Sequence, residues 1–188
     1  NGFSGFIERV FEPSIFKQRI VDEENRYKEK WNPLKRYVRL YKIHGSIDWI
    51  EKDDKIQQVQ EYSGKENILI YPTQAKHFET QYTPYSELFR EMSIKLQSPN
   101  TTLIILGYGF GDDHINNLIA QSLINEDFNL IILNSYKEEN GSFTKAGEFF
   151  NKCSDNMNIH FIGGKNEKGK PLHYFDIFLS ILNGGVMD

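Results

Sequence analysis

The sequence predicts an α/β fold with a parallel sheet, and three observations lead to this class. Short apolar, β-rich segments recur along the chain and alternate with segments of helical periodicity. The best defined of them, residues 101–106 (TTLIIL), is apolar on both alternating faces, which is typical of a parallel strand covered on both sides. A glycine-rich turn and a helix start follow this strand directly, as they do in strand–turn–helix units of parallel sheets.

The N-terminal part of the chain has a less regular pattern. Residues 1–16 carry short apolar pieces and are expected to form a loop, whereas residues 16–36 are heavily charged with mixed sign and indicate a solvated arm or an insertion. Residues 37–43 (YVRLYKI) alternate and are β-rich, so we expect a strand there, resumed over residues 47–51. The polar residues 53–66 indicate a hairpin or an insertion.

Further along the chain, strands and helices alternate more clearly. Thr83 can cap a helix and Pro84 suits its first position, and apolar residues then recur on one helical face. The other expected elements are strands at residues 67–71, 129–133 and 158–162 and helices at residues 143–153 and 174–182.

The glycine-rich turn after residue 106 is the most informative stretch. Gly107, Gly109 and Gly111 allow a sharp turn and a close approach of another group to the backbone. Asp112 or Asp113 can cap the following helix, and unpaired amide hydrogens at such a helix start favour phosphate. The spacing is G-x-G-x-G-D and not G-x-G-x-x-G, so the dinucleotide fingerprint is not matched, and a turn without a ligand is the alternative. A carboxylate at position 112 suits a ribose hydroxyl better than a phosphate.

Ligands of parallel α/β sheets bind beyond the carboxyl ends of the strands. The expected strands place His44, the glycine turn, Asn134 and Gly163 on one such edge. His44 follows a strand and precedes Gly45, and a histidine there is either structural or a general base.

Aromatic and amide side chains near this edge also have two interpretations each. Tyr108 and Phe110 either line an apolar ligand pocket or pack against the turn. Asn134 either bonds a ribose hydroxyl or makes a local turn with its own backbone.

Composition excludes several function classes. The chain has 188 residues, a net charge of −4 and no basic stretch, so a nucleic-acid groove is not indicated. The single cysteine, Cys153, rules out an intrachain disulfide framework and a cysteine-built zinc site, and suits the cytoplasm. No apolar run has the roughly 20 residues that a membrane helix needs.

Four motifs in fixed order, KIHGSIDW, ILIYPT, LIILGYGFGDDHINN and LIILN, resemble the C-terminal two-thirds of a sirtuin-like domain. The resemblance is closer to the bacterial branch found in antiphage defence proteins. It covers residues 39–134, with weaker support to the C-terminus. It implies one domain over residues 1–188 with a Rossmann-like parallel sheet, helices on both faces and an incomplete N-terminus.

The resemblance also implies a site. His44 matches the catalytic histidine of the family, and NAD is the substrate. The positions that match NAD-binding residues are Gly45, Gly107, Tyr108, Gly109, Phe110, Asp112 and Asn134.

The activity implied by the resemblance is cleavage of NAD to nicotinamide and ADP-ribose in bacterial antiphage defence. The alternatives are an NAD-dependent protein deacylase and a non-catalytic nucleotide-sensing or assembly module. Protein-deacylating sirtuins carry four cysteines on a zinc module, so no zinc or other metal is expected here. The chain opens at Asn1, and the upstream phosphate turn and asparagine motif of the family are absent, so we expect a fragment of a larger protein that is inactive alone. The expected partners are NAD or ADP-ribose and either further copies of the chain or an ATPase or other defence subunit, with no membrane or nucleic acid.

Overall fold

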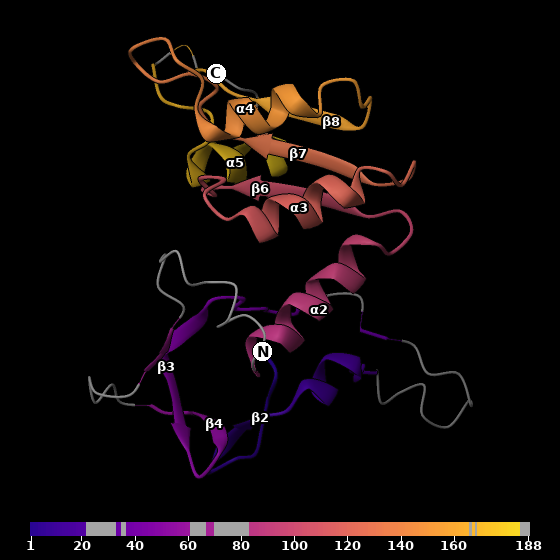
Figure 1. The fold of residues 1–188 in the computed structure, drawn as a ribbon, viewed down its shortest axis with the longest axis vertical. Coiled ribbons are helices and arrows are strands. Elements are labelled where there is room, and N and C mark those ends of the chain that lie inside the picture. The colour runs from indigo at the N-terminus through magenta and orange to yellow at the C-terminus, as the bar shows by residue number, and fades with distance from the viewer. Residues whose placement is uncertain are drawn as a thin grey trace. The chain divides into compact units, whose positions relative to one another are not determined.

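The computed structural model contains two compact units, Asn1–Met92 and Ser93–Asp188 (Figure 1). It describes residues 1–21, 33–34, 37–60, 67–69, 83–165, 167 and 169–184. Helix α2 (Tyr85–Leu96) contains the boundary between the units, and it begins after Thr83 and Pro84 as predicted. A single domain over residues 1–188 stays a prediction, and most of the charged segment 16–36 lies outside the described residues.

The first unit contains an antiparallel sheet with the strand order β1-β2-β4-β3-β5. Its strands are β1 (Phe3–Ser4), β2 (Arg9–Phe11), β3 (Gly45–Lys52), β4 (Lys55–Gln58) and β5 (Asn67–Leu69). Asp53 and Asp54 join β3 to β4 with φ of 52° and 56°, and two consecutive positive φ angles match the twist of a two-residue hairpin. For residues 53–66, where the sequence predicts a hairpin or an insertion, a hairpin is therefore confirmed at its turn, residues 53–54.

Aromatic side chains form the core of the first unit. The buried residues are Phe3, Phe11, Phe16, Trp49 and Leu88, with Tyr41, Ile43 and Ile56 packed against them. The Trp49 ring is only 1% exposed and its centroid lies 5.0 Å from that of Phe3. Large rings bury much apolar area per residue, which suits a sheet made of short strands.

Two predictions for this unit are wrong. Residues 1–16 contain β1, β2 and the 3-10 helix η1 (Pro13–Lys17), and are not simply a loop. Residues 37–43 are not a strand; the strand begins at Gly45, after His44. Tyr41 and Ile43 pack against the core, while Val38 is 89% exposed. The alternation of apolar and polar residues in this segment therefore reflects packing of one side against the core and not pairing with a neighbouring strand.

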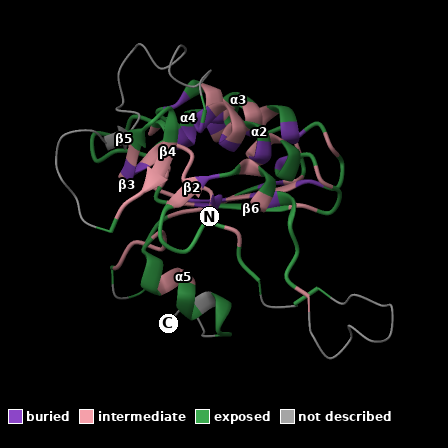
Figure 2. Cartoon of the chain, turned by 90° about the horizontal axis from the view of Figure 1, so that it is seen from below, coloured by how far each residue is buried: buried purple, intermediate pink, exposed green. Residues whose placement is uncertain are grey.

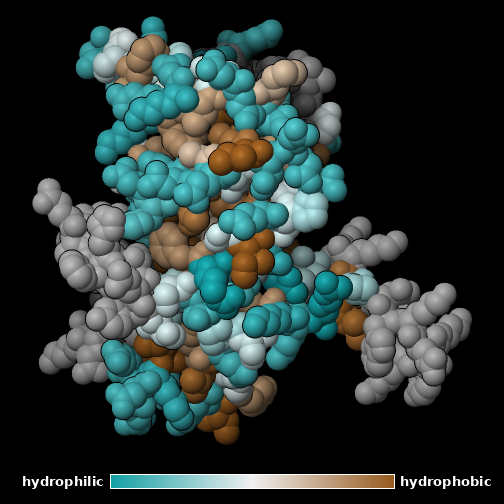
Figure 3. Space-filling view, turned by 45° about the vertical axis from the view of Figure 1, so that its right-hand side comes forward, coloured by the Kyte–Doolittle hydropathy of each residue, from teal (hydrophilic) through white to brown (hydrophobic). Residues whose placement is uncertain are grey.

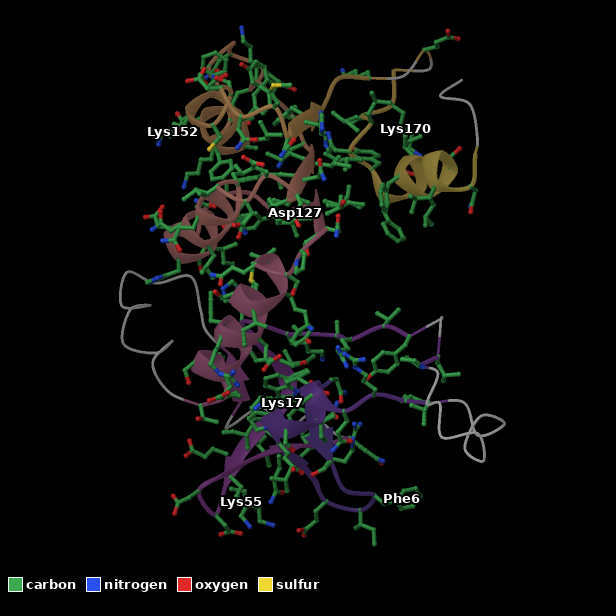
Figure 4. All side chains as sticks on the ribbon, turned by 90° about the vertical axis from the view of Figure 1, so that its right-hand side faces the viewer. Phe6, Lys17, Lys55, Asp127, Lys152 and Lys170 are labelled. Carbon is green, nitrogen blue, oxygen red and sulfur yellow. The ribbon has the colours of Figure 1, made fainter. Side chains whose placement is uncertain are left out.

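The second unit contains the parallel sheet, with the order β6-β7-β8. The strands are β6 (Thr102–Leu106), β7 (Asn129–Leu133) and β8 (Ile159–Ile162), and the helices are α3 (Asp113–Ser122), α4 (Lys145–Lys152) and α5 (Phe175–Leu182). Five of the six lie within the ranges that the sequence predicts, and α3 begins directly after Asp112, one of its two predicted caps. Figure 4 shows α3 and α4 on one side of the sheet and α5 on the other, with Lys152 and Lys170 marking the two sides. The predicted α/β class, with helices on both faces of a parallel sheet, is confirmed for this unit.

Burial differs between the two faces of this sheet. Leu130 and Ile132 of β7 are 0% exposed, and their register neighbours Ile105 and Ile159 are also buried. On the opposite face Ile104 is 42% exposed, so complete cover of both faces of β6 is not observed. In Figure 2 the buried residues gather on α3 and α4, whereas α5 is largely exposed, and Figure 3 shows mostly hydrophilic side chains on the visible face of this unit.

Helix α4 is fixed against the loop that follows β7. Thr144 caps the helix by accepting a hydrogen bond from the Gly147 amide at 3.0 Å, and its hydroxyl donates to the Ser135 carbonyl at 2.6 Å. A Cβ atom on Gly147 would lie 2.4 Å from the Tyr136 carbonyl oxygen. Only glycine allows the helix to lie this close to the loop.

We predict that Gly147→Ala destabilises the protein, although alanine in a helix is usually more favourable than glycine by about 0.5–1 kcal/mol. The added methyl group must displace backbone, and overpacking of this kind costs about 1–3 kcal/mol. Thermal unfolding of the variant, with Glu148→Ala on the exposed side of the same helix as the control, measures the effect. A melting temperature of Gly147→Ala equal to or above that of the unaltered protein would contradict the close approach.

Candidate functional site

The glycine turn after β6 presents its backbone to open space. Gly107 has a φ of +73° and Phe110 a φ of +52°, so the chain reverses through two residues in the left-handed region. A Cβ atom built on Gly107, Gly109 or Gly111 would meet no heavy atom of the described residues within 4 Å, apart from those of its own chain neighbours. Glycine at positions 109 and 111 is therefore not imposed by neighbouring protein atoms, and the space beside them can admit a ligand.

The hydroxyl of Tyr108 holds the turn in this shape. It lies 2.9 Å from Oδ1 of Asn116 and 3.0 Å from the carbonyl oxygen of Asp112, and it accepts from the Asp112 amide at 3.3 Å. Nδ2 of Asn116 donates to the Phe110 carbonyl at 3.1 Å. The turn is thus bonded to the first turn of α3 at two points, which preserves its open form without a ligand.

Asp112 caps α3, as the sequence predicts. Its Oδ1 accepts from the amides of His114 at 3.0 Å and Ile115 at 3.4 Å, and the residue is 6% exposed. These amides are the ones that the sequence analysis offered to a phosphate, and that expectation is wrong because the protein's own carboxylate already occupies them. Asp112 can contribute to ligand binding through the turn that it holds.

Asn134, at the end of β7, joins this turn to the next strand end. Its Nδ2 donates to the Tyr108 carbonyl at 2.9 Å, and its Oδ1 accepts from the Ser135 amide at 2.8 Å. An amide group has two donor hydrogens and two acceptor lone pairs, so one of each is left for a ligand hydroxyl. Bracing the two loops is the observed role of Asn134, and a ribose contact stays a prediction.

The two aromatic residues of the turn pack against protein. Phe110 is 3% exposed, and its ring centroid lies 4.9 Å from those of Tyr108 and Phe149. Packing of both rings against the turn is therefore observed, and a ligand contact of Tyr108 or Phe110 stays a prediction. Phe110 and Gly111 also border a pocket of about 390 Å³ between α3 and α4, whose other lining residues carry charges of both signs.

A second pocket, of about 370 Å³, lies beyond the carboxyl ends of β7 and β8. Its lining residues are Ser135, Tyr136, Lys137, Gly164, Lys165, Pro171 and His173. Asn134 and Gly163 immediately precede parts of this lining, so the edge predicted from the sequence does carry a cavity. We call it the rim pocket. Its lysines and His173 were not predicted from the sequence, because the folding of the loops after β7 and β8 brings them together.

His44 lies in the first unit, and the argument that placed it on the same sheet edge is wrong. It precedes β3 in a tight turn with Gly45 at a φ of +80°, and its neighbouring sheet is antiparallel. The ring is partly buried and its centroid lies 6.4 Å from that of Phe89. The catalytic role of His44 and the ligand role of Gly45 stay predictions.

The turn that carries His44 is fixed by polar contacts on both sides. Nζ of Lys42 donates to Oγ of Ser46 at 2.6 Å and lies 3.3 Å from Oδ1 of Asp48. Burial raises the pKa of Asp48, but hydrogen bonds from Ser46 and Gln58 and the charge of Lys42 outweigh it, so the pKa lies below its usual value. Asp48 is therefore ionised at neutral pH and orients the turn through its contacts with Lys42 and Gln58.

Within the described ranges, no group of three histidine, cysteine, aspartate or glutamate side chains is arranged to hold a metal ion. Among the helices in the described part of the chain, none combines the length and apolarity that crossing a bilayer requires.

Comparison with known proteins identifies a matching family. The model of the SIR2-like domain family matches residues 3–162, which cover most of both units and contain the His44 turn, the glycine turn and Asn134. No curated protein matches the chain.

We predict that Tyr108 ionises at higher pH than an ordinary tyrosine, because burial, followed by the charges of Asp112 and Asp113, raises its pKa to about 12 against the opposing effect of its backbone hydrogen bond. A pKa raised in the folded state adds stability below pH about 10, which is lost as the pH rises towards 12. The difference in phenolate absorbance between the unaltered protein and Tyr108→Phe isolates this group. A midpoint near pH 10 in that difference would show that the hydroxyl is not held as described.

Proposed function

Because the chain belongs to the SIR2-like domain family, we propose that it forms the larger part of an NAD glycohydrolase. SIR2-like domains use NAD. The observation that carries the proposal is the open glycine turn at Gly107–Gly111, braced by Asn134 beside the rim pocket. Two neighbouring parallel strand ends with a cavity beyond them are where a dinucleotide binds in α/β sheets.

The residues at this edge fit the nucleotide part of NAD. The bare backbone of Gly109 and Gly111 allows a ribose or pyrophosphate to approach closely, since no side chain fills the space. The remaining donor and acceptor of Asn134 match a ribose hydroxyl. The rim pocket, at about 370 Å³, has the size of a small-ligand site.

The proposed reaction breaks the bond between nicotinamide and C1′ of its ribose, and water supplies the new C1′–O bond. The products are nicotinamide, ADP-ribose and one proton, so no oxidant or metal is needed. Positive charge develops on the ribose as the bond breaks. We assign His44 the role of general base that removes a proton from a ribose hydroxyl or from the water. The bonds of Lys42 to Ser46 and Asp48 support this role by fixing the backbone on both sides of the imidazole.

We predict that His44→Ala lowers the rate of nicotinamide release from NAD by the full-length protein about 10²–10⁴-fold, the usual contribution of a general base. Nicotinamide is quantified by chromatography at saturating NAD. His160→Ala is the matched control, since His160 is an exposed residue of β8 and is expected to leave the rate unchanged. Equal rates for His44→Ala and the unaltered protein would remove His44 from the mechanism.

The same assay separates the proposal from the two alternatives. A protein deacylase releases nicotinamide only when an acetyl-lysine peptide is present, whereas a glycohydrolase needs no peptide. Binding of ADP-ribose with no turnover by the full-length protein would favour a nucleotide-sensing module.

We further propose that this activity serves antiphage defence in the bacterial cytoplasm, with other copies of the chain or an ATPase subunit controlling it. The support is the likeness to the defence branch in the four ordered motifs. Loss of cellular NAD on phage infection in cells carrying the full-length protein, absent with His44→Ala, would support the role.

A further inference from the structure

Basic residues are among those that line the rim pocket. Lys137, Lys165 and His173 belong to the lining, and none of its described residues is an aspartate or glutamate. Neither lysine forms an ion pair with another of the residues that the structure describes. The pocket therefore offers positive charge that the described protein does not neutralise.

Each of the two lysines forms an isolated β-bridge in the loop that follows its parallel strand. Lys137 pairs with Phe143 in the loop after β7, and Lys165 pairs with Pro171 in the loop after β8. Each lysine thus begins a closed loop three or four residues beyond the end of its parallel strand. Nζ of Lys137 also lies 5.3 Å from the centre of the Phe143 ring, a contact that holds the side chain.

His173 adds an unused polar atom to the same lining. Its Nδ1 is buried and has no hydrogen-bond partner in the described part of the protein. Buried polar atoms nearly always form a hydrogen bond. An unbonded one in a residue that lines a cavity therefore indicates a ligand or water molecule as its partner. Gly164, between the two strand-end loops, has a φ of +93° and open space where a Cβ would stand.

From these features we propose that the rim pocket binds a phosphate monoester on the adenosine ribose, so that the site prefers NADP to NAD. The inference rests on the proposed function. In dinucleotide sites of α/β sheets, a carboxylate at the ribose selects its free hydroxyls, whereas a nearby cation accommodates a 2′-phosphate. The rim pocket resembles the second arrangement, because two lysines and a histidine are among its lining residues and none of the described ones carries a carboxylate.

The expected preference is modest because both lysines are exposed. Charge-assisted contacts to phosphate are stronger than neutral ones, but solvent screens exposed pairs. We expect 2′-phospho-ADP-ribose to bind the full-length protein about tenfold more tightly than ADP-ribose at about 0.1 M salt. The difference should shrink as salt is added.

Isothermal titration calorimetry with these two ligands tests the inference without relying on turnover. In the double variant Lys137→Gln and Lys165→Gln the two affinities are expected to converge. Lys95→Gln is the matched control and should keep the preference, because Lys95 is an exposed residue of α2 that lines neither pocket. Circular dichroism checks that each variant is folded.

Equal affinities of the unaltered protein for the two ligands would overturn the inference, and so would a preference that survives in the double variant. Tight binding of ADP-ribose without a gain from the phosphate would leave the proposed function standing and remove only the preference. If neither ligand binds the full-length protein, both proposals fall together.

Discussion

The side-chain amide of Asn134 is the constraint on which the candidate site depends. It bonds the carbonyl of Tyr108 in the turn after β6 and the amide of Ser135 in the loop after β7, at 2.9 and 2.8 Å. Parallel strands bring these two ends together, but the strand pairing stops at Leu106 and Leu133. Without a bridge beyond that point, each loop would be free to move separately. The side-chain amide of Asn134 therefore holds the two loops together beyond the last paired residues of the strands.

Tyr108 and its partners extend the same constraint towards α3. Its hydroxyl contacts Asp112 and Asn116, and Asp112 in turn caps the helix. The carbonyls of Tyr108 and Phe110 and the hydroxyl of Tyr108 thus bond to protein groups, while the space beside the turn's glycines stays open among the described residues. Such preorganisation reduces the ordering cost that a ligand would otherwise bear. It also explains why a helix start that is closed to phosphate can belong to a nucleotide site.

The second unit was largely predictable because its signals are local. Residues 101–106, 129–133 and 158–162 are short apolar runs bounded by turns, and each of the following helices has a cap or an apolar face. In the first unit, the same reasoning failed, because a segment forms a strand there only if a neighbouring strand is present to pair with it. Residues 37–43 alternate because Tyr41 and Ile43 face the aromatic core, but alternation does not show whether a neighbouring strand is present to pair with. Strands of two or three residues, such as β1 and β2, have no pattern long enough to detect.

Sequence reasoning identified the site residues that shape the glycine turn. It did not identify the residues that come together only when the loops fold. The glycines, Asp112 and Asn134 were found because their types have special backbone or capping roles. Lys137, Lys165 and His173 were missed because loops joined by single β-bridges set their convergence, and no spacing reveals it. His44 was placed on the wrong side of its strand, so its role now rests on the family motif and on the fixed turn that carries it.

The central claim is that the open glycine turn and Asn134 together contact a nucleotide, and a nuclear magnetic resonance titration tests it most directly. ADP-ribose is added to the isotopically labelled full-length protein while the backbone amides of Gly107, Gly109 and Gly111 and the side-chain amide of Asn134 are followed. The account predicts that these signals shift together and saturate at one ligand concentration. Saturable binding of ADP-ribose that leaves all four signals unmoved would contradict it.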